Sequence, residues 1–560
     1  MKRKKSTTKR LGIVVLILIA QVYANSSFSQ AMFQKTFGTQ SDEIGTFVIL
    51  DNKGNYAITG HHFNQNNNSR DILLLQLDSC GNQNFSELYG GKKDDIGMCI
   101  QQLSTSDYII AGTTYSYGIG QDDQYLIKTS NTGTPISGVS VGGVNNENSE
   151  YLAVDNKNEV VKIGSTNYDT LNRKSDIYVT CTNSAGGLMW TRTYGGKKDD
   201  YGFSIKYTPV DSGYILAGST RSYGAGGLDA YIIKINKVGG VIWAKSYGSK
   251  YDDEAFDITL CKSGGYAFTG RTRDTISKDS SGITLSNNVY VVRINNNGGV
   301  IWTNYYGGSK DEQGEAIIEC ADSSTLVIAG NTYSFGAGNS DGYLLKLQSN
   351  GNMIWGKAYG GSKEEAFYSV VHTRDNGYFT VGKTNSFGSG LNDIYTVKTD
   401  INGKSGCYEK DGGLQHKASG VSDTLYSITQ FGQPDKGFKA DSVFFYDTIL
   451  CSTCKIDSTA DSAKYFRGSN IHSSTGTNSD ISLFPNPAKQ NIFVKSSFDL
   501  KENYELVIIN NLGATVFREQ LSGSEINSGK LIDINKLPNG IYQLIIQGNS
   551  IKTKKFIVTH

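Results

Sequence analysis

The chain has 560 residues, and its 54 Lys and Arg against 53 Asp and Glu leave a formal net charge of +1. This balance excludes a broadly basic nucleic-acid binder and a polybasic membrane-surface protein. With 65 Gly, only 6 Pro, 34 Tyr and 23 Phe, the composition predicts many tight turns, aromatic-rich strands and little helix.

The N-terminus has the pattern of an export signal. Six basic residues between Lys2 and Arg10 precede an apolar run over residues 12–20 and then small residues. This pattern predicts a secretory signal peptide over residues 1–24, with cleavage as late as residue 31. A membrane anchor is the alternative, but spanning a bilayer takes about 20 apolar residues, roughly twice this run.

Residues 32–404 repeat one unit seven times. A Tyr-Gly or equivalent pair recurs at spacings of 52, 52, 53, 53, 59 and 53 residues, counted at Gly38, Gly90, Gly142, Gly195, Gly248, Gly307 and Gly360. A period near 50 residues with four short strands per unit is typical of propeller blades. We therefore predict an all-β chain with a seven-bladed β-propeller of four-stranded blades. An open solenoid is the alternative, but no polar capping repeats are visible.

The fourth copy gives the order of strands in a blade: residues 201–207, 213–218, 229–235 and 241–247. Their placement from the inside of the blade outwards rests on a resemblance in layout to quinoprotein-type blades. If every blade has this strand order, the repeat region begins with a single outer strand and ends with the three inner strands of a last, incomplete blade. We therefore expect residues 33–37 to complete the last blade and close the ring.

Loops that depart from the repeat are the candidate ligand-binding residues. Alternation of strand direction places the long loops between second and third strands, and between blades, on one face. On this face the first, third and fifth blades have loops that differ from the repeat in sequence or length. Such loops could form a ligand cleft; the alternative is that they differ through neutral drift in exposed loops. Together with the repeated loop aromatics, the candidates are His61, His62, Tyr117, Tyr168, Arg173, Tyr223, Arg271, Arg273, Asp274, Lys278, Phe335 and Phe387. A metal site at His61 and His62 is not expected, because adjacent strand residues point to opposite faces.

Acidic residues recur at the start of every blade, for example Asp199-Asp200 and Glu364-Glu365. A sevenfold ring of carboxylates predicts either binding of calcium or a cationic ligand or carboxylates that accept backbone N–H groups in their own loops. The second interpretation is favoured, because a residue present in every blade serves the blade. We expect no cofactor other than this possible calcium.

Residues 405–480 are rich in Ser, Thr and Asp and are expected to be a linker or a small accessory module, with a strand pair near 423–428 and 442–446. Cys451 and Cys454 could suggest zinc or a redox pair, but zinc needs further ligands. For an exported chain, a disulfide from Cys407 to Cys451 or Cys454 is favoured. The propeller cysteines are expected to be buried thiols.

Residues 481–560 form short alternating strands with four motifs in order: Phe-Pro-Asn-Pro, Asn-Leu-Gly, Leu-Pro-Asn-Gly-Ile-Tyr and Lys-Thr-Lys-Lys. They resemble the type A C-terminal sorting domain of the type IX secretion system of Bacteroidota. The residues that carry the resemblance are Pro485, Asn486, Pro487, Gly513, Pro538, Asn539, Gly540, Tyr542, Lys554 and Lys555. The resemblance implies a small β-sandwich that directs export across the outer membrane. It also implies removal by a sortase, with attachment to anionic lipopolysaccharide.

The sequence therefore predicts an exported or cell-surface propeller that binds a glycan or a protein. A polysaccharide hydrolase or lyase on the same scaffold is the alternative, as is a structural surface component. The sequence contains no Gly-x-Ser-x-Gly elbow, His-Glu-x-x-His helix or phosphate loop, so no catalytic residue is nominated.

Overall fold

The computed structural model describes residues 31–167, 175–279, 282–320, 322, 324–412, 414–417, 433–435, 439–442, 446–452, 481–484, 490–496, 503–510, 515–538, 540–547 and 551–558. The predicted signal peptide therefore lies outside the described residues. The chain divides into two compact units, residues 1–454 and 455–560.

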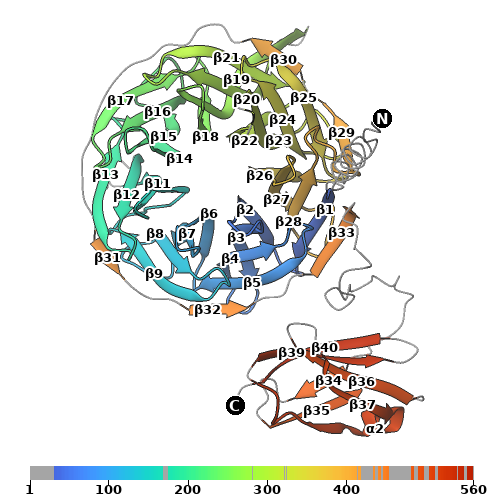
Figure 1. Cartoon of the computed structure of the whole chain (residues 1–560). Coiled ribbons are helices and arrows are strands. Elements are labelled where there is room, and N and C mark those ends of the chain that lie inside the picture. Colours follow the sequence, from blue (N-terminus) through green and yellow to red (C-terminus); the bar gives the residue numbers. More distant parts are fainter. Residues whose placement is uncertain are drawn as a thin grey trace, which may run out of the picture. The chain divides into compact units, whose positions relative to one another are not determined.

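The first unit is a seven-bladed β-propeller, as the repeat predicts (Figure 1). Each blade is an antiparallel sheet whose first strand is innermost. The first three blades contain β2 (Glu43–Leu50), β3 (Tyr56–Asn64), β4 (Ser69–Leu77) and β5 (Gln83–Gly90); β6 (Asp95–Gln102), β7 (Tyr108–Thr114), β8 (Asp123–Thr129) and β9 (Pro135–Gly142); and β10 (Tyr151–Val154), β11 (Val160–Thr166), β12 (Asp176–Thr182) and β13 (Leu188–Tyr194).

The remaining four blades follow in chain order around the ring. They contain β14 (Asp200–Thr208), β15 (Gly213–Thr220), β16 (Asp229–Ile235) and β17 (Val241–Tyr247); β18 (Asp253–Leu260), β19 (Tyr266–Asp279), β20 (Gly282–Ile294) and β21 (Val300–Gly307); β22 (Glu312–Glu319), β23 (Thr325–Thr332), β24 (Asp341–Gln348) and β25 (Met353–Tyr359); and β26 (Glu365–His372), β27 (Tyr378–Thr384), β28 (Asp393–Thr399) and β1 (Phe33–Gly38).

The N-terminal strand closes the ring. β1 pairs antiparallel with β28, from Phe33 opposite Lys398 to Phe37 opposite Ile394. Phe33 and Phe37 are fully buried in the core between the last and first blades. The prediction that this segment completes the seventh blade is confirmed, and the edge of β28 is paired rather than exposed.

Repeated tyrosines fasten one blade to the next. The hydroxyl of Tyr247 donates to the Gly298 carbonyl of the following blade at 2.7 Å, and Tyr194 donates to Gly239 at 2.8 Å. Gly298 has a φ of 74°, which favours glycine because a side chain is strained there. The Tyr-Gly pairs and turn glycines of the repeat thus stabilise contacts between blades.

One segment after the seventh blade, residues 409–452, adds a fifth strand to five blades. This outer segment contains β29 (Glu409–Asp411) on β25, β30 (Leu414–Lys417) on β21, β31 (Gln433–Asp435) on β9, β32 (Lys439–Ser442) on β5 and β33 (Tyr446–Ser452) on β1. Within the described ranges, the other two blades gain no fifth strand. The expected linker or accessory module is therefore corrected here: these strands belong to the propeller, held by backbone pairing that needs no apolar pattern. The expected strand at 423–428 lies outside the described residues.

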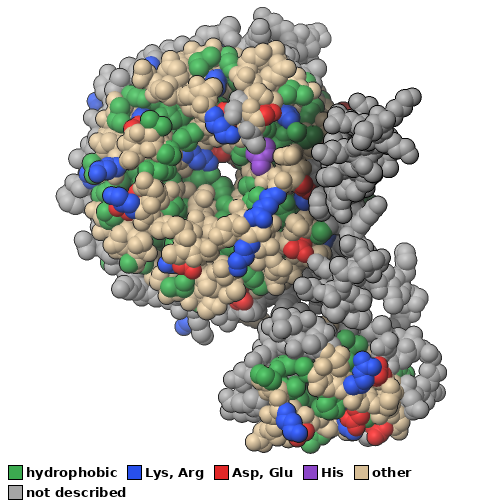
Figure 2. Space-filling view, viewed as in Figure 1, with side chains coloured by type: hydrophobic (Ala, Val, Ile, Leu, Met, Phe, Trp, Pro, Cys, Tyr) green, Lys and Arg blue, Asp and Glu red, His purple; other side chains and the backbone are tan. Residues whose placement is uncertain are grey.

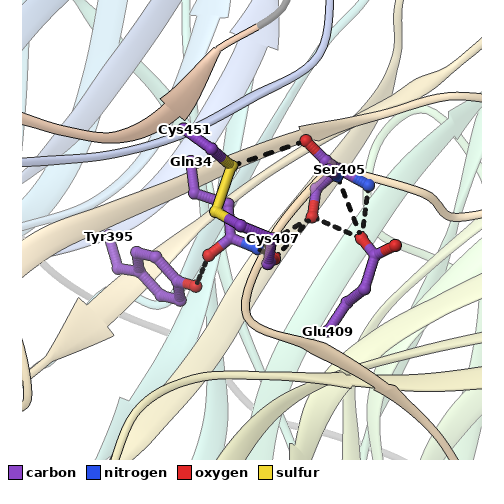
Figure 3. Close-up of a disulfide and its surroundings, with 7 residues drawn as sticks. Gln34, Tyr395, Ser405, Cys407, Glu409 and Cys451 are labelled. Atoms are coloured by element: carbon purple, nitrogen blue, oxygen red, sulfur yellow. Dashed lines mark hydrogen bonds between the residues drawn. A yellow bond between two sulfur atoms is a disulfide. The ribbon is translucent and has the colours of Figure 1, made fainter.

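A disulfide joins the two ends of the outer segment. Cys407, just before β29, is bonded to Cys451 in β33, with their Cα atoms 6.1 Å apart (Figure 3). The amide of Gln34 in β1 donates to Ser405 Oγ at 2.7 Å beside this bond. The predicted cross-link from Cys407 is confirmed, with Cys451 as its partner.

The remaining described cysteines follow the sequence expectation with one exception. Four of them are free and buried: Cys99, Cys181, Cys261 and Cys320. Cys80 instead forms a disulfide, which corrects its assignment as a buried thiol. It lies in the turn before β5 and is only half-buried.

The second unit is a small β-sandwich. One sheet contains β34 (Ile481–Phe484), β35 (Asn491–Ser496) and β38 (Lys530–Asp533); the other contains β36 (Asn503–Asn510), β37 (Thr515–Ser522), β39 (Gly540–Gln547) and β40 (Ile551–Val558). Ile492 and Ile532 of the first sheet share a core with Leu506 and Leu544 of the second. A short helix, α2 (Gly523–Ser528), is capped by Ser522. No helix in the described part of the chain has the length and apolarity needed to cross a membrane.

Candidate functional site

Each blade begins with a buried acid that is bonded to its own loop. Glu365 is typical: its carboxylate accepts the Gly361 N–H at 2.7 Å, the Thr384 hydroxyl at 2.6 Å and the Ser386 N–H at 3.2 Å. The other six are Glu43, Asp95, Glu147, Asp200, Asp253 and Glu312. These contacts favour the local structural role, and calcium binding stays a prediction.

The loop aromatics nominated from the sequence pack within their own blades. Tyr223 lies 5.7 Å from Tyr231 between ring centroids, and its hydroxyl donates to the Gly195 carbonyl at 3.0 Å. The other three repeat the ring contact: Tyr117 on Tyr125, Phe335 on Tyr343 and Phe387 on Tyr395. These contacts stabilise the blades; a further role in ligand binding stays untested.

The two histidines of the first blade have different surroundings. His62 is buried and takes the place that threonine has in other blades, with Nδ1 2.7 Å from the carboxylate of Glu43. His61 is half-buried, and its Nδ1 has no hydrogen-bond partner among the described residues. Burial, followed by the charge of Arg70, lowers the pKa of His61 to about 4. His61 is therefore neutral at physiological pH.

The long loop of the fifth blade continues as a β-hairpin. β19 and β20 stay paired as far as Asp279 opposite Gly282. Arg271 on this hairpin is half-buried, whereas Arg273 is exposed. Asp274 and Lys278 lie on β19, but their side chains are outside the described part, as are Tyr168 and Arg173 altogether.

Six of the seven inner strands carry a bulge three residues after the repeat acid. β-bulges leave one residue unpaired and re-aim its side chain. The bulged residues are Thr46, Met98, Phe203, Phe256, Glu315 and Tyr368. Glu150, immediately before β10, has the equivalent place in the third blade. All seven are half-buried and differ in chemistry.

Contacts between non-adjacent blades place these positions at the central channel. The rings of Phe47 in the first blade and Tyr151 in the third meet edge-to-face at 5.0 Å. The charge of Glu315 in the sixth blade acts on Glu150 in the third. Non-adjacent blades can meet only across the axis of the ring, where Figure 2 shows a narrow opening.

Glu150 and Glu315 are the two carboxyl groups among the seven bulged or equivalent positions. Burial, and then the charge of Glu315, raises the pKa of Glu150 to about 7. Burial also raises the pKa of Glu315 to about 7, against the lowering effects of Gln313 and Arg271. Carboxyl groups with such raised pKa values cluster at functional sites.

Each of the two glutamates is oriented by an amide two residues earlier. Asn148 Nδ2 donates to Glu150 Oε1 at 2.7 Å, while Asn148 Oδ1 accepts the Ser165 N–H at 2.6 Å. Gln313 Nε2 likewise donates to Glu315 Oε1. The two carboxylates are thus oriented by the same interaction, a hydrogen bond from a side-chain amide two residues earlier, in two separate blades.

The fifth blade adds a charged pair and an aromatic surface. Arg271 Nε donates to Glu254 Oε1 at 2.7 Å, and its guanidinium lies 5.8 Å from the ring centroid of Phe256. Phe256 also contacts Phe203 of the fourth blade at 5.3 Å. The channel therefore offers carboxylates, amides and aromatic faces side by side. Among the side chains that the structure describes, no three His, Cys, Asp or Glu residues are grouped to hold a metal ion.

Sequence reasoning found Arg271 but did not single out the channel residues. Glu150 and Glu254 were visible as extra acids near the start of their blades, without a reason to separate them from the ring. The shared Asn-x-Glu and Gln-x-Glu pattern at Glu150 and Glu315 was an available signal. A bulge, however, cannot be read from apolar alternation, so the direction of these side chains was hidden.

The sorting motifs are only partly described. Tyr542 is buried, and its hydroxyl donates to the Pro538 carbonyl at 2.8 Å. Gly540, Lys554 and Lys555 lie on the paired strands β39 and β40, although the side chains of the two lysines are not described. The other motif residues lie outside the described part: Pro485, Asn486, Pro487, Gly513 and Asn539.

Comparison with protein families agrees with these motifs. Residues 482–559 match the family described as the secretion system C-terminal sorting domain. The chain thus carries a type IX sorting domain and is exported by that machinery to the cell surface or the medium. No curated protein matches the chain.

Two solved structures from Porphyromonas gingivalis show weak similarity. PorZ, an essential bacterial surface component of the type-IX secretion system, is 9% identical; the match covers 94% of this chain and all of PorZ, with a TM-score of 0.23. Dimeric latent PorU is 9% identical over 59% of this chain and 31% of PorU, with a TM-score of 0.13. At these TM-scores, neither match is evidence for a fold or a function of this chain.

Proposed function

We propose that this exported propeller is a binding module that takes a glycan chain at the mouth of its central channel. The observation that carries the proposal is that Glu150 and Glu315, each held by its own amide, occupy the same position of their blades as Phe203 and Phe256, whose rings contact each other. Oriented carboxylates accept hydroxyl donors, and aromatic faces stack on the apolar faces of sugars. This set of groups suits a neutral polyhydroxylated ligand.

Variation between blades supports this location. Five different residue types occupy the bulged or equivalent position in the seven blades, whereas the residue three positions earlier is always Asp or Glu. A single ligand in a sevenfold ring needs asymmetric contacts, and the bulges supply them. We also propose that a sortase removes the C-terminal domain and attaches the propeller to anionic lipopolysaccharide at the cell surface.

A polysaccharide hydrolase is the second candidate, favoured by the same pair. A glycosidase uses two carboxyl groups, one of which must be protonated near the working pH. A pKa of about 7 for Glu150 and Glu315 meets that need. Release of reducing ends from a bound polysaccharide, abolished by E315Q, would support the hydrolase in place of the binding module.

The test is glycan-array binding by the full chain, followed by titration of the best ligand. E150Q or E315Q should weaken binding about ten-fold, because hydrogen bonds to a charged group are worth roughly 1.5–3 kcal/mol. E364Q is the matched control, since Glu364 is exposed in a loop of the same face and should bind as the unmodified chain does. Equal binding by E315Q, E150Q and E364Q would remove the channel from the proposal.

A further inference from the structure

A pocket on the opposite face, that of the short turns, departs from the repeat. It has a volume of about 350 Å³ and lies between the fifth and sixth blades. Its lining residues are Ser263, Gly264, Arg293, Asn295, Asn296, Ile301 and Ser349. This volume lies within the usual range for small-molecule sites and accommodates a single sugar ring.

Arg293 occupies a position where five of the seven blades carry a cation; Lys128 is half-buried and the others, Lys234, Arg293, Lys346 and Lys398, are buried. In the second, fourth and seventh blades this cation is a lysine paired with an aspartate of its own short turn. The pairs are Lys128 with Asp107 at 3.1 Å, Lys234 with Asp211 at 2.8 Å and Lys398 with Asp375 at 3.0 Å. In the sixth blade, hydrogen bonds from Ser324 and Thr325, and then the charge of Lys346, lower the pKa of the short-turn residue Asp322.

The fifth blade lacks this aspartate. Its short turn has Ser263 instead, whose hydroxyl accepts from Arg293 Nη2 at 3.1 Å. The other contacts of the guanidinium are the neutral carbonyls of Gly264, Tyr266 and Ile294. In the described part of the chain, no carboxylate lies within ion-pair distance of Arg293, which is only 6% exposed. A buried cation without an anion is unfavourable.

The neighbouring amides also turn their acceptors away from the pocket. Asn296 Oδ1 accepts the Gly265 N–H at 2.6 Å. Asn295 Oδ1 accepts the N–H groups of Asn297 and Gly299, both at 2.9 Å. The amide oxygens are thus engaged by backbone, and no described acceptor is recorded for either NH2 group. Around Arg293 the pocket thus holds one positive charge and two amide NH2 groups.

We propose that this pocket binds an oxyanion, as carried by an acidic sugar, in the place of the aspartate that the fifth blade lacks. A carboxylate or sulfate would neutralise Arg293 and accept from Asn295 and Asn296. Exposed Ile301 provides an apolar wall for a sugar ring. This site is independent of the channel, because it lies on the other face and uses none of its residues.

The test compares sodium glucuronate, glucose and sodium sulfate as ligands of the full chain at constant ionic strength, by calorimetry. Glucuronate should bind and glucose should not. Ser263→Asp restores the aspartate of the repeat and should weaken glucuronate binding at least ten-fold. Ser263→Asn has nearly the same shape without the charge and should keep it. E315Q should also keep it, which separates this site from the channel.

Two results would overturn the proposal: equal heats from glucuronate and glucose, or unchanged glucuronate binding by Ser263→Asp. The sulfate arm identifies the source of the oxyanion. Sulfate binding as tightly as glucuronate supports a site for a free oxyanion, and glucuronate binding ten-fold tighter supports an acidic sugar. Thermal unfolding of Ser263→Asp checks that loss of binding is not loss of fold, since this variant should melt at or above the temperature of the unmodified chain.

Discussion

The inner and outer edges of the blades end in different ways. At the outer edge, strands β29–β33 continue five of the sheets through backbone hydrogen bonds, and a disulfide joins the ends of that segment. At the inner edge, bulges interrupt the pairing and turn unlike side chains towards the channel. Backbone pairing depends little on the identity of the side chains, whereas the ligand that a channel binds depends on the side chains that line it. The outer edge therefore maintains the ring, and the inner edge is where recognition can differ between blades.

Breaking the outer edge should have the largest effect. The double variant Cys407→Ser, Cys451→Ser releases a cross-link that spans 44 residues, which should lower the free energy of unfolding by about 4 kcal/mol on the loop-entropy model. Denaturant unfolding under non-reducing conditions measures this change. Cys181→Ala, which removes a free buried thiol, is the control and should have the smaller effect. An unchanged midpoint for the double variant would show that the outer segment contributes little.

Removing a repeat acid should have the next largest effect. Glu365→Ala leaves the Gly361 and Ser386 N–H groups and the Thr384 hydroxyl without their acceptor. We expect a loss of about 3 kcal/mol in unfolding free energy, with glycan affinity unchanged for the molecules that remain folded. A variant that is as stable as the unmodified chain but has lost affinity would contradict the division between structural acids and channel acids.

The smallest expected effect is a change in pH dependence at the inner edge. Folded Glu150 and Glu315 have pKa values of about 7, above the ordinary value of 4.5. Between these limits the folded chain binds more protons than the unfolded chain, so this contribution makes stability fall as pH rises from about 4.5 to 7. E150Q and E315Q should each flatten that slope and raise stability at pH 8 by about 1–2 kcal/mol.

Melting temperatures at pH 5 and pH 8 measure this effect. E364Q is again the control, because an exposed carboxyl group should not change the slope. A pH profile for E315Q that is parallel to that of the unmodified chain would show that Glu315 titrates normally. Glycan affinity should fall on acidification below pH 7, since protonation removes the carboxylate acceptors.

The repeat made the ring predictable, because its period and its Tyr-Gly pairs are encoded in side chains. The placement of residues 33–37 followed from counting strands. The outer segment could not be predicted in this way: β29 is Glu-Lys-Asp and β31 is Gln-Pro-Asp, and neither has an apolar pattern. Pro434 within β31 is tolerated because that strand lies at a sheet edge.

The channel site was hidden for a related physical reason. Glu150 and Glu315 became distinguishable from the repeat acids only in the structure, where both lie three residues after the repeat acid and the charge of Glu315 acts on Glu150. Tyr223 and Phe335, in contrast, look like ligand-binding residues in sequence because they lie in glycine-rich loops. Their rings pack on Tyr231 and Tyr343, which repetition in four blades already indicated.

The cross-link between Cys407 and Cys451 also sets the path of mechanical load. A pull that enters β33 at Cys451 passes through the sulfur bridge to Cys407, beside the end of the seventh blade. The 43 residues between the two cysteines then carry no tension, because the bridge is the shorter covalent route. Tension applied to β33 would therefore bypass β29, β30, β31 and β32, which would stay paired with their blades.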